Sequence, residues 1–289
     1  MVTVEANAKI NLTLDILGTR PDGYHDVEMV MQSVGLSDII YLERREKGIS
    51  LQIDVPELPT DKTNLAWNAA HLFLDVYKIQ SGVSIKIKKK IPIAAGLAGG
   101  SADAAGTLIG MNSLFETRLS KKELCKLGEK IGSDVPFCIE GGTMLATGRG
   151  EVLRRLPDLP QLFVVLAKPP VSVSTAWAYK NYDKMGSTRH PDTNAILSAI
   201  TTGHVEGIEK ALANVLEEAT MKAYPIVEEY KRILTENGAT EALMSGSGPT
   251  VFAIAREKKD MEHAAAMLSH AYPDAAIFVV PTVKQNTIS

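Results

Sequence analysis

A two-domain α+β protein is the fold that the sequence predicts, and three observations support it. Alternating apolar and polar residues dominate the first part of the chain, as in strands with one buried face. Helical spacing of apolar residues dominates the second half. Pro157 and Pro160 interrupt the chain between these parts. In a chain of 289 residues, this favours an N-terminal domain over residues 1–157 and a C-terminal domain over residues 158–289.

The N-terminal domain is predicted to begin with strands. Apolar residues occupy every second position of residues 2–16, which places Lys9 and Asn11 together on the opposite face of that strand. The next predicted elements are a turn at residues 20–23, strands at 38–42 and 50–55, a loop at 56–62, a helix at 64–76 and a strand at 83–87.

A glycine-rich segment, PIAAGLAGGSADAAG at residues 92–106, follows that strand and enters a helix predicted over residues 101–114. Glycine lets the backbone approach a ligand, and the unpaired amides at a helix start favour anionic oxygens. A tight turn with close helix packing is the alternative for a glycine cluster alone. The segment is not a Walker A motif or a Rossmann GxGxxG fingerprint, and the protein-kinase signatures are absent.

The later elements are predicted from caps and short apolar runs. Ser120 and Glu123 form a capping box that opens a helix reaching residue 131, and Gly238 is a suitable C-cap for a helix over residues 225–237. The other predicted elements are strands at residues 162–167, 250–255 and 276–280, a short segment at 241–244, a loop at 245–249 and a helix at 261–271.

The composition excludes several classes of protein. A formal net charge of -3 and a pI near 6.1 argue against a surface for nucleic acid, so a small-molecule partner is expected. Cys125 and Cys138 form no CxxC pair and have no metal-spaced histidines beside them, which favours reduced, partly buried thiols. The N-terminus lacks the apolar stretch of a signal peptide, and no run reaches membrane-span length. A cytoplasmic protein that binds neither membrane nor nucleic acid is expected.

Three motifs in order resemble those of the GHMP kinases. The run PxxxGLxGGSA at residues 92–102 resembles the family's phosphate-binding motif, AKIN at residues 8–11 its first motif, and SGSGPT at residues 245–250 its third. A flexible connector between strands is the alternative for the last segment alone. Asn7 stands where the family often has proline, and Ala102 where it often has a second serine.

Three further segments are similar to the branch of this family whose acceptor is a cytidine-diphosphate-linked methylerythritol. They are RPDGYH at residues 20–25, GSDVP at 132–136 and ATGRG at 146–150. The resemblance implies a sheet-rich N-terminal domain, a mainly helical α/β C-terminal domain and an active-site cleft between them. It also implies transfer of the γ-phosphate of ATP, with Mg²⁺, to the acceptor's 2-hydroxyl in non-mevalonate isoprenoid precursor biosynthesis.

Two other functions stay open at this point. A GHMP kinase for homoserine or mevalonate would share the glycine loops without needing Tyr24 and His25. A catalytically silent nucleotide-binding regulator would be expected to lack Lys9 or Asp134, and this chain has both. A monomer or a homodimer is expected.

Lys9 and Asp134 are the candidate catalytic residues. Phosphoryl transfer needs a base or orienting group at the acceptor hydroxyl, and Asp134 suits that role. Capping of a helix ahead of Pro136 is its structural alternative. The resemblance implies that Lys9 faces Asp134 and the transferred phosphate, whereas a solvated lysine on an edge strand is the alternative.

The remaining candidate residues would hold the two ligands. The resemblance implies nucleotide contacts from Asn64, Lys89, Pro92, Ala94, Ala95, Gly96, Leu97, Ala98, Gly99, Gly100, Ser101 and Ala102. The substrate-binding candidates are Asn11, Tyr24, His25 and Tyr179. Aromatic faces hold a planar base, so Tyr24 and Tyr179 are expected to stack on the cytosine while His25 reads its polar edge. Each of these aromatic residues has a half-buried core position as its alternative, and no protein ligand is assigned to magnesium.

Overall fold

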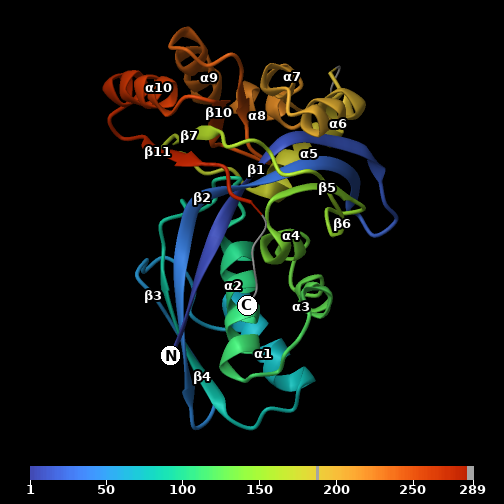
Figure 1. Ribbon diagram of the computed structural model, residues 1–289, viewed down its shortest axis with the longest axis vertical. Coiled ribbons are helices and arrows are strands. Elements are labelled where there is room, and N and C mark those ends of the chain that lie inside the picture. The colour runs from blue at the N-terminus through green and yellow to red at the C-terminus, as the bar shows by residue number, and fades with distance from the viewer. Residues whose placement is uncertain (187–188, 285–289) are drawn as a thin grey trace.

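Two β-sheets organise the protein, which a computed structural model describes at residues 1–186 and 189–284 (Figure 1). Within those residues the larger sheet has seven strands; five follow the order β3-β4-β2-β1-β8, β5 pairs with β2, and β6 pairs with β5. They are β1 (Val2–Thr19), β2 (His25–Arg45), β3 (Ile49–Ile53), β4 (Gly82–Lys88), β5 (Thr143–Thr147), β6 (Val152–Arg155) and β8 (Ala213–Asn214). The smaller sheet, in the order β11-β7-β10-β9, contains β7 (Phe163–Lys168), β9 (Ala242–Met244), β10 (Val251–Ala255) and β11 (Ala276–Pro281).

Helices pack on these sheets, and the part of the chain that the structure describes contains ten. They are α1 (Leu65–Val76), α2 (Gly99–Leu114), α3 (Lys121–Gly128), α4 (Val135–Glu140), α5 (Thr175–Met185), α6 (Thr193–Thr202), α7 (Val205–Lys210), α8 (Glu217–Ala223), α9 (Ile226–Glu236) and α10 (Lys258–Ala271). The predicted α+β class and the helix-rich second half are confirmed. Most of the predicted helices are found with ends shifted by a few residues, and the capping box of Ser120 and Glu123 is formed.

The hairpin of β1 and β2 is longer than the sequence predicted. Only residues 38–42 of β2 were expected as strand, whereas β2 covers His25–Arg45. Its first half pairs with β5 and its second half with β4, so it is a central strand along much of its length. Three register shifts in the β1–β2 pairing also break the simple alternation that marks a strand in a sequence. Strand β5 was not predicted, because it is buried on both faces and does not alternate, and the four-residue strand β6 was also missed.

The β1–β2 hairpin runs between two groups of elements (Figure 1). Helices α6 to α10 gather at one end with the smaller sheet, and α1, α3, β3 and β4 lie toward the other end. Strand β8, from the later half of the chain, pairs with β1 and so adds an edge to the larger sheet. The domain division between residues 157 and 158 stays a prediction, and residues 285–289 of the second domain lie outside the described part.

Both cysteine thiols are kept in their neutral form. Burial, with the Glu140 carboxylate nearby, raises the pKa of Cys125 to about 12, and burial also raises the pKa of Cys138 above its ordinary value. Both cysteines are free of disulfides, in agreement with the prediction. Among the described helices, none is long and apolar enough to cross a membrane.

Candidate active site

A cavity of about 960 Å³ brings together residues that are far apart in the sequence. Strand β1, the turn before β2, the segment leading into α2, the start of α4 and helix α5 all contribute to its wall. The predicted site residues that line it are Lys9, Asn11, Tyr24, His25, Asn64, Lys89, Pro92, Ala94, Ala95, Gly96, Leu97, Ala98, Gly99, Gly100, Ser101, Asp134 and Tyr179. Ala102 does not line the cavity, because its side chain is buried in the hydrophobic core.

The phosphate loop, defined here as residues 92–98, leads from β4 into α2. Its backbone turns through positive φ angles at Ala94 (49°), Gly96 (74°) and Ala98 (57°). Ala98 is the N-cap of α2, and its side chain makes no capping hydrogen bond. The amide groups that open α2 are therefore left without a side-chain cap, while the helix dipole favours negative charge at this end. The cavity wall at this point suits a phosphate group.

Two neighbouring segments hold the phosphate loop in place. The backbone N–H of Lys9 in β1 donates to the carbonyl oxygen of Leu97 at 3.2 Å. The hydroxyl of Ser245 donates to the carbonyl oxygen of Gly96 at 3.0 Å. The predicted third motif therefore contacts the predicted second motif directly, although about 150 residues separate them in the sequence. The 245–249 loop is part of the site and not only a connector between strands.

Lys9 and Asn11 lie side by side at the cavity wall. The ammonium of Lys9 donates to Oδ1 of Asn11 at 2.5 Å and lies 3.9 Å from Oδ2 of Asp134. Lys9 is only 5% exposed, so it is not a solvated edge-strand lysine. A buried ammonium needs a negative or polar partner, and both are supplied here. Lys9 and Asp134 therefore place a positive charge and a carboxylate side by side at the cavity wall.

Asp134 occupies the N-cap position of α4 without acting as its cap. Its side chain makes no capping hydrogen bond to the helix. The carboxylate is about one-third exposed and faces Lys9. The helix start is set instead by Pro136, which has the fixed φ angle that suits this position. The side chain of Asp134 is therefore available to a ligand in the cavity.

Aromatic residues also line the cavity. The rings of His25 and Tyr179 lie 5.0 Å apart, and Nε2 of His25 is 2.7 Å from Oδ1 of Asp183 on α5. Tyr24 is 56% exposed, with the guanidinium carbon of Arg149 5.3 Å from its ring centre. Burial raises the pKa of Tyr179 well above its ordinary value, and the charge of Asp134 adds to that effect.

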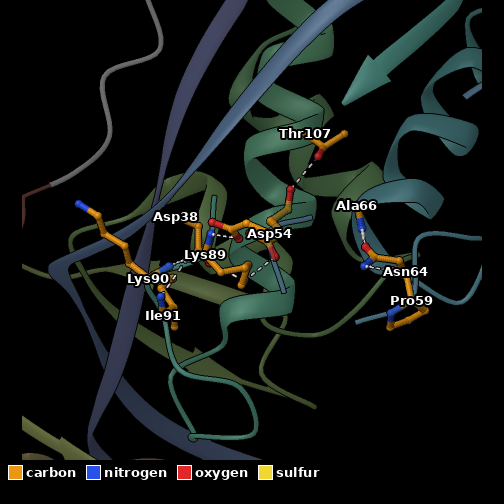
Figure 2. Close-up of polar contacts among 10 residues, drawn as sticks. Asp38, Asp54, Pro59, Asn64, Ala66, Lys89, Lys90, Ile91 and Thr107 are labelled. Carbon is orange, nitrogen blue, oxygen red and sulfur yellow. Dashed lines mark hydrogen bonds and ion pairs between the residues drawn. The ribbon is translucent and has the colours of Figure 1, made fainter. Parts of the chain in front are cut away.

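Asn64 and Lys89 line the cavity while holding other parts of the protein (Figure 2). Asn64 caps α1 by accepting from the N–H of Ala66 at 2.9 Å and donates to the carbonyl oxygen of Pro59 at 2.8 Å. The ammonium of Lys89 contacts Asp38 at 2.5 Å and Asp103 at 2.6 Å. The side chain of Lys89 is therefore a buried cation.

Several cavity residues were not assigned by the sequence. Asp103 lies on α2 within the glycine-rich segment but was given no role, and Arg149 belongs to the ATGRG segment that was quoted without a role for its arginine. Asp183 lies one helical turn after Tyr179 on α5, a spacing that places both on one face of the helix. Only this last relation had a signal in the sequence, and it depended on knowing where α5 begins.

Comparison with protein families places these segments in a known context. The description "GHMP kinases N terminal domain" matches residues 64–142, and "GHMP kinases C terminal" matches residues 196–274. The first of these regions contains the phosphate loop and Asp134, and the two lie on opposite sides of the predicted domain boundary.

Individual proteins give closer matches. The 4-diphosphocytidyl-2-C-methyl-D-erythritol kinase of Acetivibrio thermocellus is 46% identical over 258 residues, covering 89% of this chain and 91% of that protein. The enzyme of the same name from Geobacillus kaustophilus is 48% identical over 263 residues, covering 90% of each. A crystal structure of 4-(cytidine 5'-diphospho)-2C-methyl-D-erythritol kinase superposes with a TM-score of 0.82 at 31% identity, covering 97% of this chain and 99% of that one. Homoserine kinase from Cytophaga hutchinsonii, with a TM-score of 0.78 at 19% identity over 98% of this chain and 95% of that one, shares the fold.

Proposed function

Because the chain belongs to the GHMP kinase family, we propose that it transfers the γ-phosphate of ATP to the 2-hydroxyl of 4-diphosphocytidyl-2-C-methyl-D-erythritol. Relatives 44–48% identical over about nine-tenths of the chain carry this acceptor in their name. One observation of the structure carries the proposal: the Lys9–Asp134 pair lies in the same cavity as the phosphate loop. A donor phosphate and an acceptor hydroxyl can meet there.

The phosphate loop and Lys9 would bind the donor. Loop backbone amides and the open end of α2 offer hydrogen bonds to phosphate oxygens without adding a mobile side chain. Lys9, held by Asn11, supplies a positive charge that neutralises part of the charge on the transferred group. Ser101, in the first turn of α2, adds a hydroxyl at the cavity wall. Ala102 is buried and takes no part in this binding.

Asp134 would act on the acceptor. Its carboxylate takes the proton of the 2-hydroxyl as that oxygen forms a bond to the γ-phosphorus. The bond from the γ-phosphorus to the oxygen that bridges it to the β-phosphate breaks, and ADP leaves with that oxygen.

Magnesium fits this site as a partner of the ATP phosphates. In the part of the chain that the structure describes, no group of three or more His, Cys, Asp or Glu side chains could hold a metal ion. Mg²⁺ usually keeps several waters and binds through one or two carboxylates together with substrate phosphates. The Ser101 hydroxyl, which lines the cavity, would supply an oxygen ligand from the protein, and water and the ATP phosphates would supply the others. The bound ion would neutralise charge on the phosphates.

The aromatic wall, formed by Tyr24, His25 and Tyr179, would select the cytidine end of the acceptor. Tyr24 is an exposed ring at the cavity, and the Tyr179 ring packs beside His25, so a planar base finds apolar faces there. Nε2 of His25 already contacts Asp183, which leaves Nδ1 of His25 for a polar contact with the base. Homoserine and mevalonate carry no base and gain nothing from this wall.

A comparison of acceptors tests the proposal. The purified chain is supplied with ATP, Mg²⁺ and, in separate reactions, the cytidine-linked methylerythritol, homoserine or mevalonate, and ADP formation is measured. Turnover is expected with the cytidine-linked acceptor alone. Turnover of either simpler alcohol in its place would overturn the substrate assignment, and no turnover with any of the three would favour a nucleotide-binding regulator. A cytoplasmic location and a monomeric or homodimeric state remain predictions.

A further inference from the structure

Three buried charged side chains connect the two ends of the phosphate loop. Lys89 precedes the loop, and Asp103 follows it on α2. The ammonium of Lys89 contacts Oδ2 of Asp103 at 2.6 Å and Oδ2 of Asp38 at 2.5 Å. All three side chains are at most 6% exposed. Lys89 therefore links the chain entering the loop to the helix leaving it.

Asp38 is the central acceptor of this cluster. Its Oδ1 accepts hydrogen bonds from the backbone N–H groups of Lys90 at 2.6 Å and Ile91 at 2.9 Å. Asp38 thus contacts three consecutive residues immediately before Pro92, where the loop begins. Its own side chain is completely buried in β2 and does not line the cavity. Any effect of Asp38 on the ligands must pass through the residues that it holds.

The phosphate loop needs such support because its backbone is unusual. Ala94 and Ala98 have positive φ angles, which side-chain-bearing residues rarely adopt. Backbone of this kind persists only where the surrounding structure fixes it. Phosphate binding by amide groups also depends on their direction, because a hydrogen bond weakens steeply when it is misaligned. A phosphate loop whose two ends were not held would lose these φ angles and the alignment of its amide groups.

A stabilising role alone does not account for the cluster well. Two carboxylates and one ammonium are taken out of water here, and apolar residues of similar volume often stabilise a core as well as a buried ion pair does. What charged groups add is direction, because each contact fixes one atom against another. Here these contacts fix the residues at the start of the phosphate loop.

We propose that Asp38 is a positioning residue for ATP, which fixes the phosphate loop through Lys89 and through the amides of Lys90 and Ile91. The proposal rests on the proposed function for the identity of the nucleotide. It assigns no contact between Asp38 and ATP. Its signature is a loss of affinity for the nucleotide with little change in affinity for the acceptor, since the aromatic wall is built from other segments.

Two variants test this inference at different strengths. Asp38→Ala removes the contacts to Lys89 and to both amides, whereas Asp38→Asn keeps an oxygen for the amides and loses the charge that holds Lys89. We expect the KM for ATP to rise about 10- to 100-fold in Asp38→Ala, because displaced binding groups can cost that much, and by a smaller factor in Asp38→Asn. The KM for the acceptor is expected to change less than about threefold.

Asn112→Ala is the matched control. Asn112 is also buried on α2, where it accepts from the N–H of Leu119 at 2.8 Å and donates to the carbonyl oxygen of Leu119 at 3.0 Å. It does not line the cavity. This variant should lower the melting temperature and leave the KM for ATP unchanged. The control separates a loss of stability from a loss of loop position.

A binding measurement without acceptor keeps this inference separate from the proposed function. The dissociation constant of a non-hydrolysable ATP analogue is measured by calorimetry for the wild type, both Asp38 variants and Asn112→Ala. A weaker constant in the Asp38 variants supports the inference, whichever acceptor the protein uses. An unchanged constant in folded Asp38→Ala overturns it, as does an equal rise in KM for both substrates. If Asp38→Ala does not fold, the same comparison on Asp38→Asn decides.

Discussion

Gly96 and Ser245 are in direct contact in the active site, where the Ser245 hydroxyl donates to the Gly96 carbonyl oxygen at 3.0 Å. A Cβ atom at Gly96 would fall 2.1 Å from the backbone oxygen of Ser245. The φ angle of Gly96 is also +74°. The two glycine loops, one from each half of the chain, therefore approach as closely as they do because residue 96 has no side chain.

Gly96→Ala should disrupt this contact. The added methyl group must push the 245–249 loop away from the phosphate loop, which is expected to lower the free energy of unfolding by about 3 kcal/mol and to weaken ATP binding severely. Gly203→Ala is the matched control, because Gly203 has a φ of +65° but open space around its Cβ position. In this control, the free energy of unfolding should fall by only about 1–2 kcal/mol, because alanine is strained at a positive φ angle, and ATP binding should be kept. Urea unfolding and ATP titration of both variants make the comparison, and equal losses would contradict the close-contact explanation.

Asp134→Asn should separate catalysis from binding. The amide cannot accept the acceptor's proton, so turnover is expected to fall by about 10²- to 10⁴-fold. The helix should survive, because the Asp134 side chain makes no capping hydrogen bond to α4. Steady-state kinetics and calorimetric binding of an ATP analogue measure the two effects. Asp192→Asn, at the N-cap of α6 and outside the large cavity, is the control that should keep full turnover. Near-normal turnover in Asp134→Asn would refute its role as base.

Tyr24→Ala should chiefly affect the cytidine-linked acceptor. Loss of a stacking face typically costs about 1–3 kcal/mol per base, which corresponds to a rise in the acceptor KM of about 5- to 150-fold. The KM for ATP should stay nearly constant. Tyr41→Ala is a close control, because Tyr41 has Lys88 over its ring at 5.9 Å, as Tyr24 has Arg149 at 5.3 Å, but lies outside the cavity. An acceptor KM that changes equally in both variants would count against stacking on Tyr24.

The buried cluster of Lys89, Asp38 and Asp103 should make the free energy of unfolding depend on pH. Burial raises the pKa of Asp103 from an ordinary 3.8 to about 7, against the opposing effect of Lys89, and Asp38 adds to the rise. The folded protein then binds a proton that the unfolded chain releases. The contribution of this group to stability is complete below about pH 4 and declines as the pH rises to about 7.

Asp103→Asn should remove that decline. Between pH 4 and 7 the free energy of unfolding of the wild type is expected to fall relative to the variant by up to about 1.4 kcal/mol per pH unit. Denaturant unfolding of both proteins at several pH values gives the two slopes. Parallel curves would mean that Asp103 is ionised in the folded protein throughout this range.

Local signals in the sequence predicted much of the fold and little of its long-range pairing. The capping box of Ser120 and Glu123 involves residues three apart, and it is formed as predicted. The length of β2 was missed because its two halves pair with different strands and its register with β1 shifts three times. Periodicity reports burial on one face only, so a strand covered on both faces gives a weak signal.

In the candidate site, too, local motifs were predicted and long-range contacts were not. The candidate site residues could be named from the sequence because most of them belong to local motifs, and all of these candidates but Ala102 line the cavity. The partners of Lys89 could not be named, since Asp38 is 51 residues away and Asp103 is 14 residues away along the chain. Only the folded sheet brings these charges together. A lysine beside two other lysines gives no indication of its burial in the sequence.

In the proposed reaction, this cavity joins the γ-phosphate of ATP to a hydroxyl of the cytidine-linked methylerythritol. Phosphorus NMR of the reaction tests it most directly, because the product would carry a new phosphomonoester beside the intact diphosphate of the acceptor. We predict that this phosphomonoester signal grows with the purified wild-type protein at the rate of ADP formation, and that it is lost in Asp134→Asn. ADP formation without a phosphomonoester on the acceptor would contradict the proposed reaction, and an equal signal with Asp134→Asn would contradict the role of Asp134 as its base.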